Sequence, residues 1–229
     1  MKQKSHYCFG NSEKKDGAMN FSAPDMMTHR KEFLTKIGLD FNKMVSTVLT
    51  HGSNIQVVTS EHAGQILQGF DGLVTSDPGI VLTVTTADCL PVYFFDVHGR
   101  AVGLAHAGWR GVENRILVKM VEVMKSTYQI GPEDISVLVG PHIKQCHFEV
   151  QKDTADLFSA YKSAILDRDG KIFIDLSLIV KRQLEAAGVI AKNITISEEC
   201  TYCLPEKYYS FRRDKPERVE AVLAYAMIA

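Results

Sequence analysis

Apolar residues recur along this chain with two spacings, and the spacing predicts which segments are helices and which are strands. The helical spacing of three and four residues is clearest over residues 111–128. There Val112, Ile116, Leu117, Met120, Val121 and Met124 would share one face. Weaker patterns predict helices over residues 25–37, 150–161 and 175–187. Asp175 is the expected cap of the last one, and Gly38 and Gly188 are expected stop signals.

Short apolar runs rich in β-branched residues predict strands. We expect them at residues 45–50, 54–58, 80–86, 91–95, 100–106, 135–139, 194–196, 208–213 and 219–228. The run at 80–86 is nearly continuous, which is typical of a strand buried on both faces. Asp96-Val97-His98-Gly99 is a turn signal that predicts a hairpin. We therefore expect a single α/β (α+β) domain over residues 1–229, with mixed β-sheets layered with helices. Residues 1–21 are polar and are expected to be partly mobile.

Composition narrows the function classes. Of 229 residues, 45% are hydrophobic and 23% charged, which is typical of a globular protein. The formal net charge of -1 argues against a nucleic-acid partner bound by bulk charge. No stretch approaches the ~20 apolar residues of a membrane span, and the N-terminal residues have no apolar core of a signal peptide. Five scattered cysteines do not suggest a disulfide framework, so we expect a cytoplasmic setting in which cysteine serves metal binding or catalysis.

Three predicted strands end in a motif that contains His or Cys. The motifs are Thr50-His51-Gly52, the stretch from Thr85 to Pro91 around Cys89, and the stretch from Ala105 to Gly111 around His106. Together His51, Cys89 and His106 would form a three-ligand zinc site with one position open for water or substrate, as in catalytic zinc. Copper also accepts these ligands. Taken singly, Cys89 is more readily interpreted as a small buried hydrophobic residue, and His106 as a hydrogen-bonded core histidine.

These motifs resemble the laccase-domain family, first labelled multicopper polyphenol oxidases and later described as zinc-containing purine nucleoside phosphorylases with adenosine deaminase activity. The resemblance extends from about residue 51 to 214. It rests on His51-Gly52, Asp71-Gly72, the run from Thr86 to Val92 and the run from His106 to Gly111. It continues in Gly140-Pro141, Phe148-Glu149-Val150, Cys200-Thr201-Tyr202 and the run from Ser210 to Asp214. The Gly-Gly-Val-Ser stretch usual near the family's N-terminus is not recognisable here.

The resemblance implies that His51, Cys89 and His106 hold the metal and take part in catalysis. It also implies an α/β sandwich, a cytoplasmic enzyme and no nucleic-acid role. The substrates would be a purine nucleoside and phosphate, with no membrane partner. The oligomeric state is left open between monomer and homodimer.

Phosphorolysis requires groups that hold an anion. Arg212, Arg213 and Arg110 are the candidate phosphate-binding residues, because a guanidinium matches phosphate oxygens in a bidentate manner. If 208–213 is a strand, only one of Arg212 and Arg213 faces the site. The alternatives are a surface ion pair of these arginines with Asp214, and a role for Trp109 in covering the core.

Deamination requires a carboxylate that moves protons. Asp88 and Glu149 are the acids available within the motifs. Asp88 alternatively orients a ligand histidine. The sequence does not separate these roles.

Three further enzyme or binding classes stay open. They are a copper-dependent polyphenol oxidase, a hydrolase of a cell-wall amide that uses Cys89 and His106 or zinc, and a zinc-stabilised interaction module. Cys200 and Cys203 form a CxxC pair without a second CxxC, so a redox or metal role for them is a minor hypothesis. His142, Cys146 and His147 lie in a polar loop that lines the pocket or is solvated.

Overall fold

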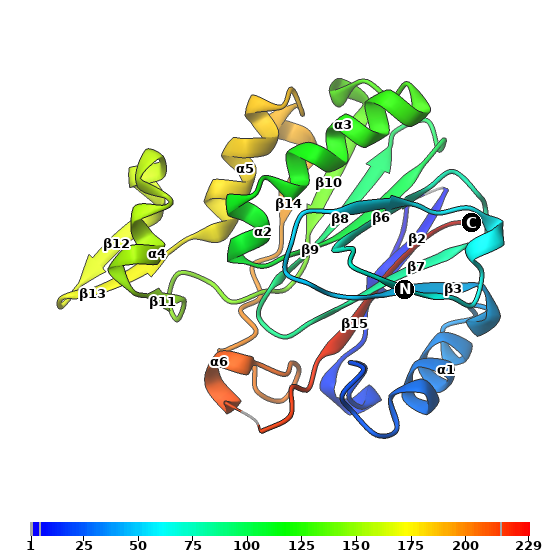
Figure 1. The fold of residues 1–229 in the computed structure, drawn as a ribbon, viewed down its shortest axis with the longest axis horizontal. Helices are drawn as coiled ribbons and strands as arrows, with labels where there is room; N and C mark the ends of the chain where they lie inside the picture. Colours follow the sequence, from blue (N-terminus) through cyan, green and yellow to red (C-terminus); the bar gives the residue numbers. More distant parts are fainter. Residues whose placement is uncertain (1, 5, 216) are drawn as a thin grey trace.

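The computed structural model describes residues 2–4, 6–215 and 217–229. Two six-stranded sheets pack face to face, and a small three-stranded sheet stands to one side (Figure 1). Helix α1 (Met26–Lys36) covers the outer face of the first sheet. Helices α2 (Trp109–Glu113), α3 (Ile116–Tyr128) and α5 (Leu176–Ala186) cover the outer face of the second sheet. The mixed α/β fold expected from the sequence is confirmed.

Both large sheets mix parallel and antiparallel pairs. In order, the first contains β1 (Lys2–Lys4), β2 (Tyr7–Asn11), β15 (Val222–Ile228), β7 (Val81–Thr86), β3 (Met44–Val48) and β5 (Ile66–Gln68). The second contains β14 (Ile194–Ile196), β10 (Ile135–Val139), β8 (Leu90–Asp96), β9 (Val102–Ala107), β6 (Gly72–Thr75) and β4 (Ile55–Val57). The third contains β11 (Glu149–Val150), β13 (Lys171–Ile174) and β12 (Ile165–Arg168).

The central strands are buried on both faces, as the sequence of residues 80–86 predicted. In β7, Val81 faces α1 while Leu82 and Val84 face the second sheet. Alternate residues of β8 and β9 face the first sheet and the helices in the same way. Packing on both faces therefore fixes the positions of these strands, so the residues at their ends are also held in place.

Several predicted elements are confirmed at nearly the expected bounds. The hairpin turn after β8 closes with a hydrogen bond from the Gly99 N–H to the Asp96 carbonyl, 3.1 Å. Asp175 caps α5, since its Oδ1 accepts from the Leu178 N–H at 2.9 Å. Among the described residues, no helix is long and apolar enough to cross a membrane.

The helix predicted over residues 111–128 is interrupted. Arg115 has φ 58°, a left-handed conformation that ends α2 before α3 begins. The apolar face continues across this break, so Val112 and Ile116 still enter one core. The hydrophobic pattern therefore shows that these residues pack into one core. Two short helices satisfy that pattern as well as one long helix does.

One predicted element is wrong in kind, and another is shorter than predicted. Residues 208–213 do not form a strand; Ser210 instead caps the short helix α6 (Phe211–Asp214), its Oγ accepting from the Arg213 N–H at 3.2 Å. The helix expected over 150–161 is reduced to α4 (Lys152–Asp156), followed by a 3₁₀ turn over Ser159–Ala164. Short polar segments of this kind take their conformation from local hydrogen bonds rather than from a periodic apolar face.

The N-terminal segment contains a strand that the sequence did not suggest. Strand β2 pairs with β15 inside the first sheet, and its Tyr7, Cys8 and Phe9 are buried. Three consecutive buried residues do not alternate, because one face of β2 meets the second sheet and the other meets the core beside α1. Residues 1 and 5 of the segment expected to be mobile lie outside the described residues.

Candidate metal centre

His51, Cys89 and His106 come together at the ends of three rigid strands. His51 follows β3, Cys89 lies between β7 and β8, and His106 is the penultimate residue of β9. One ligand atom from each lies within 4.8 Å of the others. His106 is buried, Cys89 is half-buried and His51 is exposed. The cluster therefore opens to solvent on the His51 side.

The carboxylate of Asp71 organises two of the three ligands. Its Oδ1 accepts from His106 Nδ1 at 2.9 Å and from the His51 N–H at 2.9 Å. Its Oδ2 accepts from the hydroxyl of Thr50 at 2.6 Å and the N–H of Gly52 at 2.9 Å. Because a carboxylate only accepts, His106 carries its proton on Nδ1 and Nε2 remains as the ligand nitrogen. Asp71-Gly72 is one of the family motifs, but the sequence pattern alone indicates no role for Asp71.

Charge in the cluster favours a thiolate. Burial raises the pKa of Cys89, but the neighbouring His106 and His51 outweigh burial and lower it to about 6. Burial lowers the pKa of His106, but Cys89 and Asp71 outweigh burial and raise it to about 9. Burial also raises the pKa of Asp71, yet hydrogen bonds from His106, Thr50 and Gly52 bring it well below its usual range. A thiolate suits a soft or borderline metal ion, and His106 would lose its Nε2 proton when such an ion binds.

Gly108 keeps the space beside the three ligands open. A Cβ atom at this position would lie 3.0 Å from Cys89 Sγ and 3.4 Å from His51 Cδ2. His51 itself has φ 56°, and its N–H is held by Asp71 in this left-handed conformation. An uncommon backbone conformation and a glycine required by close approach both lie at the cluster, as is usual for functional sites.

Asp88 does not orient a ligand histidine, because Asp71 does so. Asp88 instead ties two distant loops together, with φ 84° and a buried carboxylate. Its Oδ1 accepts from the Thr201 hydroxyl at 2.6 Å. Its Oδ2 accepts from the Ser210 hydroxyl at 3.0 Å and the Arg212 N–H at 2.7 Å. With both oxygens occupied, Asp88 acts as a positioning residue beside Cys89.

Arg212 and Arg213 lie on α6, so the argument from alternating strand faces does not apply to them. Arg213 Nη1 donates to the carbonyls of Thr201 and Tyr202, at 2.8 and 2.9 Å. Its Nε and Nη2 form a bidentate pair with Asp214, at 2.7 and 2.8 Å. The alternative ion pair with Asp214 is therefore present, and Arg213 holds the loop. Arg212 uses Nη1 on the Glu149 carbonyl at 2.6 Å.

The two remaining candidate residues, Arg110 and Glu149, are less buried than Asp88. Arg110 is exposed, and its guanidinium stacks on the Trp109 ring at 4.3 Å. Trp109 also packs on the helix-covered core, as its alternative role required. The carboxylate of Glu149 is partly exposed and lies 3.4 Å from Lys171 Nζ. Since Arg212 binds the Glu149 backbone, these two residues are neighbours.

A second group of ligand-type side chains contains the CxxC pair. The fold brings Cys146 and His147 to Cys200 and Cys203, with one donor atom of each within 4.8 Å of the others. The sequence contains no second CxxC pair. The other two side chains of the group are those of the adjacent residues Cys146 and His147, which lie in a different loop.

A separate hollow of about 550 Å³ lies elsewhere on the described surface. Its lining includes Gly10, Tyr93, Pro141 and Tyr208, but none of the three clustered ligands. The hollow and the cluster of His51, Cys89 and His106 are therefore separate features of the structure.

This sheet sandwich with a Cys/His cluster at its strand ends defines a family. The chain belongs to the family described as multi-copper polyphenol oxidoreductase laccase, whose model matches residues 18–224. It is 34% identical over 204 residues to purine nucleoside phosphorylase YlmD of Geobacillus stearothermophilus, covering 83% of this chain and 74% of the relative. It is 33% identical over 191 residues to adenosine deaminase RL5 of an unknown prokaryotic organism, covering 78% and 72%. The crystal structure of Geobacillus stearothermophilus YlmD matches with a TM-score of 0.89 and 28% identity, covering 98% of this chain and 92% of that one.

Proposed function

We propose that this protein is a zinc-dependent purine nucleoside phosphorylase with adenosine deaminase side activity. It would convert adenosine, inosine, guanosine or methylthioadenosine and phosphate to the free base and a ribose 1-phosphate. The observation that carries the proposal is the convergence of His51, Cys89 and His106, backed by Asp71, in a family whose relatives carry these two enzyme names. Five cysteines without a disulfide among them agree with a reducing, cytoplasmic setting.

The donor set fits zinc. Two imidazoles and one thiolate are borderline-soft ligands, and three protein ligands leave a position for substrate or water. When bound, zinc would supply Lewis acidity or a template for an oxygen ligand. Copper accepts the same donors, so metal identity is part of the proposal.

The chain's own residues would bind the anion and hold the ligands in place. Asp71 fixes the ring of His106 and the backbone of His51. In phosphorolysis a phosphate oxygen bonds to ribose C1′ as the bond from C1′ to the base breaks, and the bonding electrons leave with the base. Arg212 and Arg110 are the candidate phosphate-binding guanidinium groups, because Arg213 is already engaged by loop carbonyls and Asp214. Glu149, beside Arg212, is the candidate proton carrier for either reaction.

The test is chromatography of products from adenosine or inosine, with and without phosphate. We expect free base and ribose 1-phosphate only with phosphate, and some inosine from adenosine without phosphate. Cys89→Ser should reduce both activities by at least about 100-fold, because one ligand of the cluster becomes a weaker donor. His98→Ala, which changes an exposed histidine of the β8–β9 turn, is the matched control.

Three results would reject the proposal. The first is unchanged phosphate-dependent base release in Cys89→Ser. The second is oxygen uptake with a phenol by copper-loaded protein together with no turnover of nucleosides, which would establish the oxidase. The third is hydrolysis of an amide substrate by metal-free protein, which would establish a thiolate hydrolase.

A further inference from the structure

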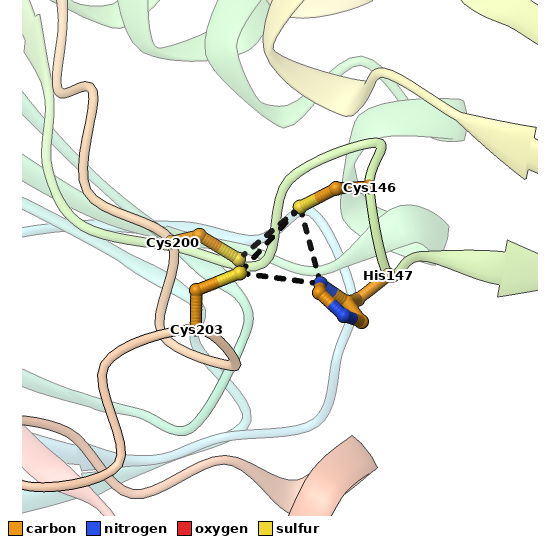
Figure 2. A group of neighbouring side chains, drawn as sticks. All are labelled: Cys146, His147, Cys200 and Cys203. Carbon is orange, nitrogen blue, oxygen red and sulfur yellow. Dashed lines mark hydrogen bonds between the residues drawn. The ribbon is translucent and has the colours of Figure 1, made fainter.

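Four side chains from two loops converge on one point outside the site described above. Cys146 and His147 belong to the loop between β10 and β11, and Cys200 and Cys203 to the loop between β14 and α6 (Figure 2). Cys146 Sγ lies 3.7 Å from Cys200 Sγ and 3.8 Å from Cys203 Sγ. His147 Nδ1 lies 3.1 Å from Cys146 Sγ and 3.3 Å from Cys203 Sγ.

These separations are those of the corners of a tetrahedron around a metal ion. A tetrahedral zinc with Zn–S bonds of about 2.3 Å places two sulfurs about 3.8 Å apart. With a Zn–N bond of about 2.0 Å, nitrogen and sulfur are about 3.5 Å apart. Both sulfur–sulfur separations agree with this geometry, and the nitrogen–sulfur separations are only slightly shorter. A disulfide would require sulfurs at about 2.05 Å, and the three cysteines are free.

A backbone donor favours a thiolate at Cys200. The Lys144 N–H points to Cys200 Sγ at 3.5 Å, and this backbone donor is one of the groups that offset burial and lower the pKa of Cys200. The buried Cys200 is also held by a parallel bridge to His142. Such N–H contacts to sulfur stabilise negative charge without using the lone pair directed at a metal.

A neighbouring aromatic ring holds His147 in place. The His147 ring stacks on the ring of Tyr202 at 3.8 Å, with an angle of 13° between the planes. Burial and the charge of Arg168 lower the pKa of His147, so the neutral ligand form is favoured. Tyr202 lies between the two cysteines of the CxxC pair, so one short segment supplies two sulfurs and the surface that orients the nitrogen.

We propose that Cys146, His147, Cys200 and Cys203 form a second, structural zinc site that fastens the loop before β11 to the loop before α6. Four protein ligands of the Cys₃His type leave no position for substrate, unlike the cluster at His51. The site takes no direct part in the reaction proposed above.

The fastened loops lead directly to the first cluster. Thr201, between the two cysteines of the pair, donates to Asp88, which precedes Cys89. The carbonyls of Thr201 and Tyr202 bind Arg213 on α6. The other loop continues into Glu149, whose carbonyl binds Arg212. The second zinc would therefore hold in place the residues that surround the catalytic cluster.

Zinc content of protein purified without added metal tests the proposal. We expect about two zinc ions per chain in the wild type and about one in Cys203→Ser, His147→Ala and Cys89→Ser. The controls Cys8→Ala and His98→Ala, which change a cysteine and a histidine outside both clusters, should keep two. Cys203→Ser and Cys89→Ser lose different ions, so the failure of one site is distinguishable from the failure of the other.

Cobalt substitution identifies which ligands are retained. Cobalt bound to Cys89→Ser protein should show strong sulfur-to-metal charge-transfer absorption and tetrahedral visible bands, both lost on adding His147→Ala. Zinc should also protect the exposed Cys146 and Cys203 of this variant from alkylation. One zinc per chain that survives in Cys203→Ser and disappears in Cys89→Ser would overturn the proposal. So would a native disulfide within the Cys146, Cys200 and Cys203 group, found by mass spectrometry of unreduced protein.

Discussion

The two clusters of ligand-type side chains are built in opposite ways. His51, Cys89 and His106 stand at the ends of strands whose positions are set by buried sheets. Cys146, His147, Cys200 and Cys203 lie in loops (Figure 2). The first cluster has three ligands and a buried carboxylate behind them; the second has four ligands, with a backbone N–H and a stacked ring beside them. An incomplete ligand set on a rigid frame suits chemistry, and a complete set on loops suits fastening.

The difference also concerns what each cluster needs from the metal. In the first cluster, Asp71 binds His106 and four backbone or hydroxyl donors of the three consecutive residues Thr50 to Gly52, so its geometry is formed by protein contacts alone. In the second, a bridge between His142 and Cys200 and a hydrogen bond from the Thr201 N–H to the His142 carbonyl join the loops. The side chains of Cys146, His147 and Cys203 are held by contacts with one another and with the Tyr202 ring. We expect metal removal to leave the first cluster ordered and to loosen the second.

Filling the space beside the first cluster should produce the largest effect. In Gly108→Ala the new methyl would lie 3.0 Å from Cys89 Sγ and displace it. A displacement of this size should lower phosphorolysis by about 100-fold and remove one zinc, while the second site keeps its ion. Steady-state kinetics and zinc content measure the two quantities. Gly131→Ala is the control, because its φ of -64° suits any residue and its methyl would meet only the end of the exposed Glu133 side chain. Loss of both metal ions in Gly108→Ala would contradict the independence of the clusters.

Removing the charge of Asp71 should weaken only the first cluster. Asp71→Asn keeps the size of the side chain but loses the anion that holds His106 Nδ1. We expect a 10- to 100-fold loss of zinc affinity there, roughly the usual cost of removing such a partner. Competition with a chromophoric chelator in the Cys203→Ser background measures this affinity alone. Asp153→Asn, at an exposed position on α4, should change nothing. Equal affinities in Asp71→Asn and its parent would show that Asp71 only supports the fold.

The number of protons released on zinc uptake should differ between the two clusters, and this difference is the smallest of the expected effects. At pH 7.5 the metal-free first cluster holds Cys89 as thiolate, with a pKa of about 6, and His106 protonated, with a pKa of about 9. Zinc requires neutral histidine, so uptake should release about one proton and strengthen as pH rises towards 9. Burial raises the pKa of Cys146 and of Cys203, so the second cluster should release two or more protons.

Calorimetry in buffers of different ionisation enthalpy measures these protons, with Cys203→Ser and Cys89→Ser isolating the two clusters. Equal proton release from both variants would contradict the difference in thiol protonation. Release of no proton by the first cluster would mean that His106 is neutral before metal binds.

The fold was predictable where buried strands impose a clear pattern. Residues 80–86 read as a strand buried on both faces, and β7 lies between α1 and the second sheet. Residues 208–213 were misread because their conformation depends on Ser210 and Asp88, side chains whose hydrogen bonds no periodic pattern reveals. Strand β2 was missed because its partner β15 lies at the other end of the sequence.

In the sites too, residues at the ends of predicted strands could be identified, and residues that only the fold brings together could not. The three ligands His51, Cys89 and His106 were selected because each follows a predicted strand, and the structure brings them together. Asp71 was missed because its function depends on a hydrogen bond to a residue 35 positions away. Cys146-His147 and Cys200-Thr201-Tyr202-Cys203 were each visible, but only the path of two loops makes them neighbours.

The position of β15 in the first sheet has a consequence for how the chain is made. Residues 222–228 lie between β2 and β7, in the interior of the sheet, and pair with both (Figure 1). Until a ribosome has released these residues, β2 has no partner on that side and β7 is exposed along one edge. The sheet can therefore close only after translation has passed Ile228, with strand edges unprotected in the meantime. A chaperone that shields nascent chains would be needed at the edges of β2 and β7 until β15 has emerged.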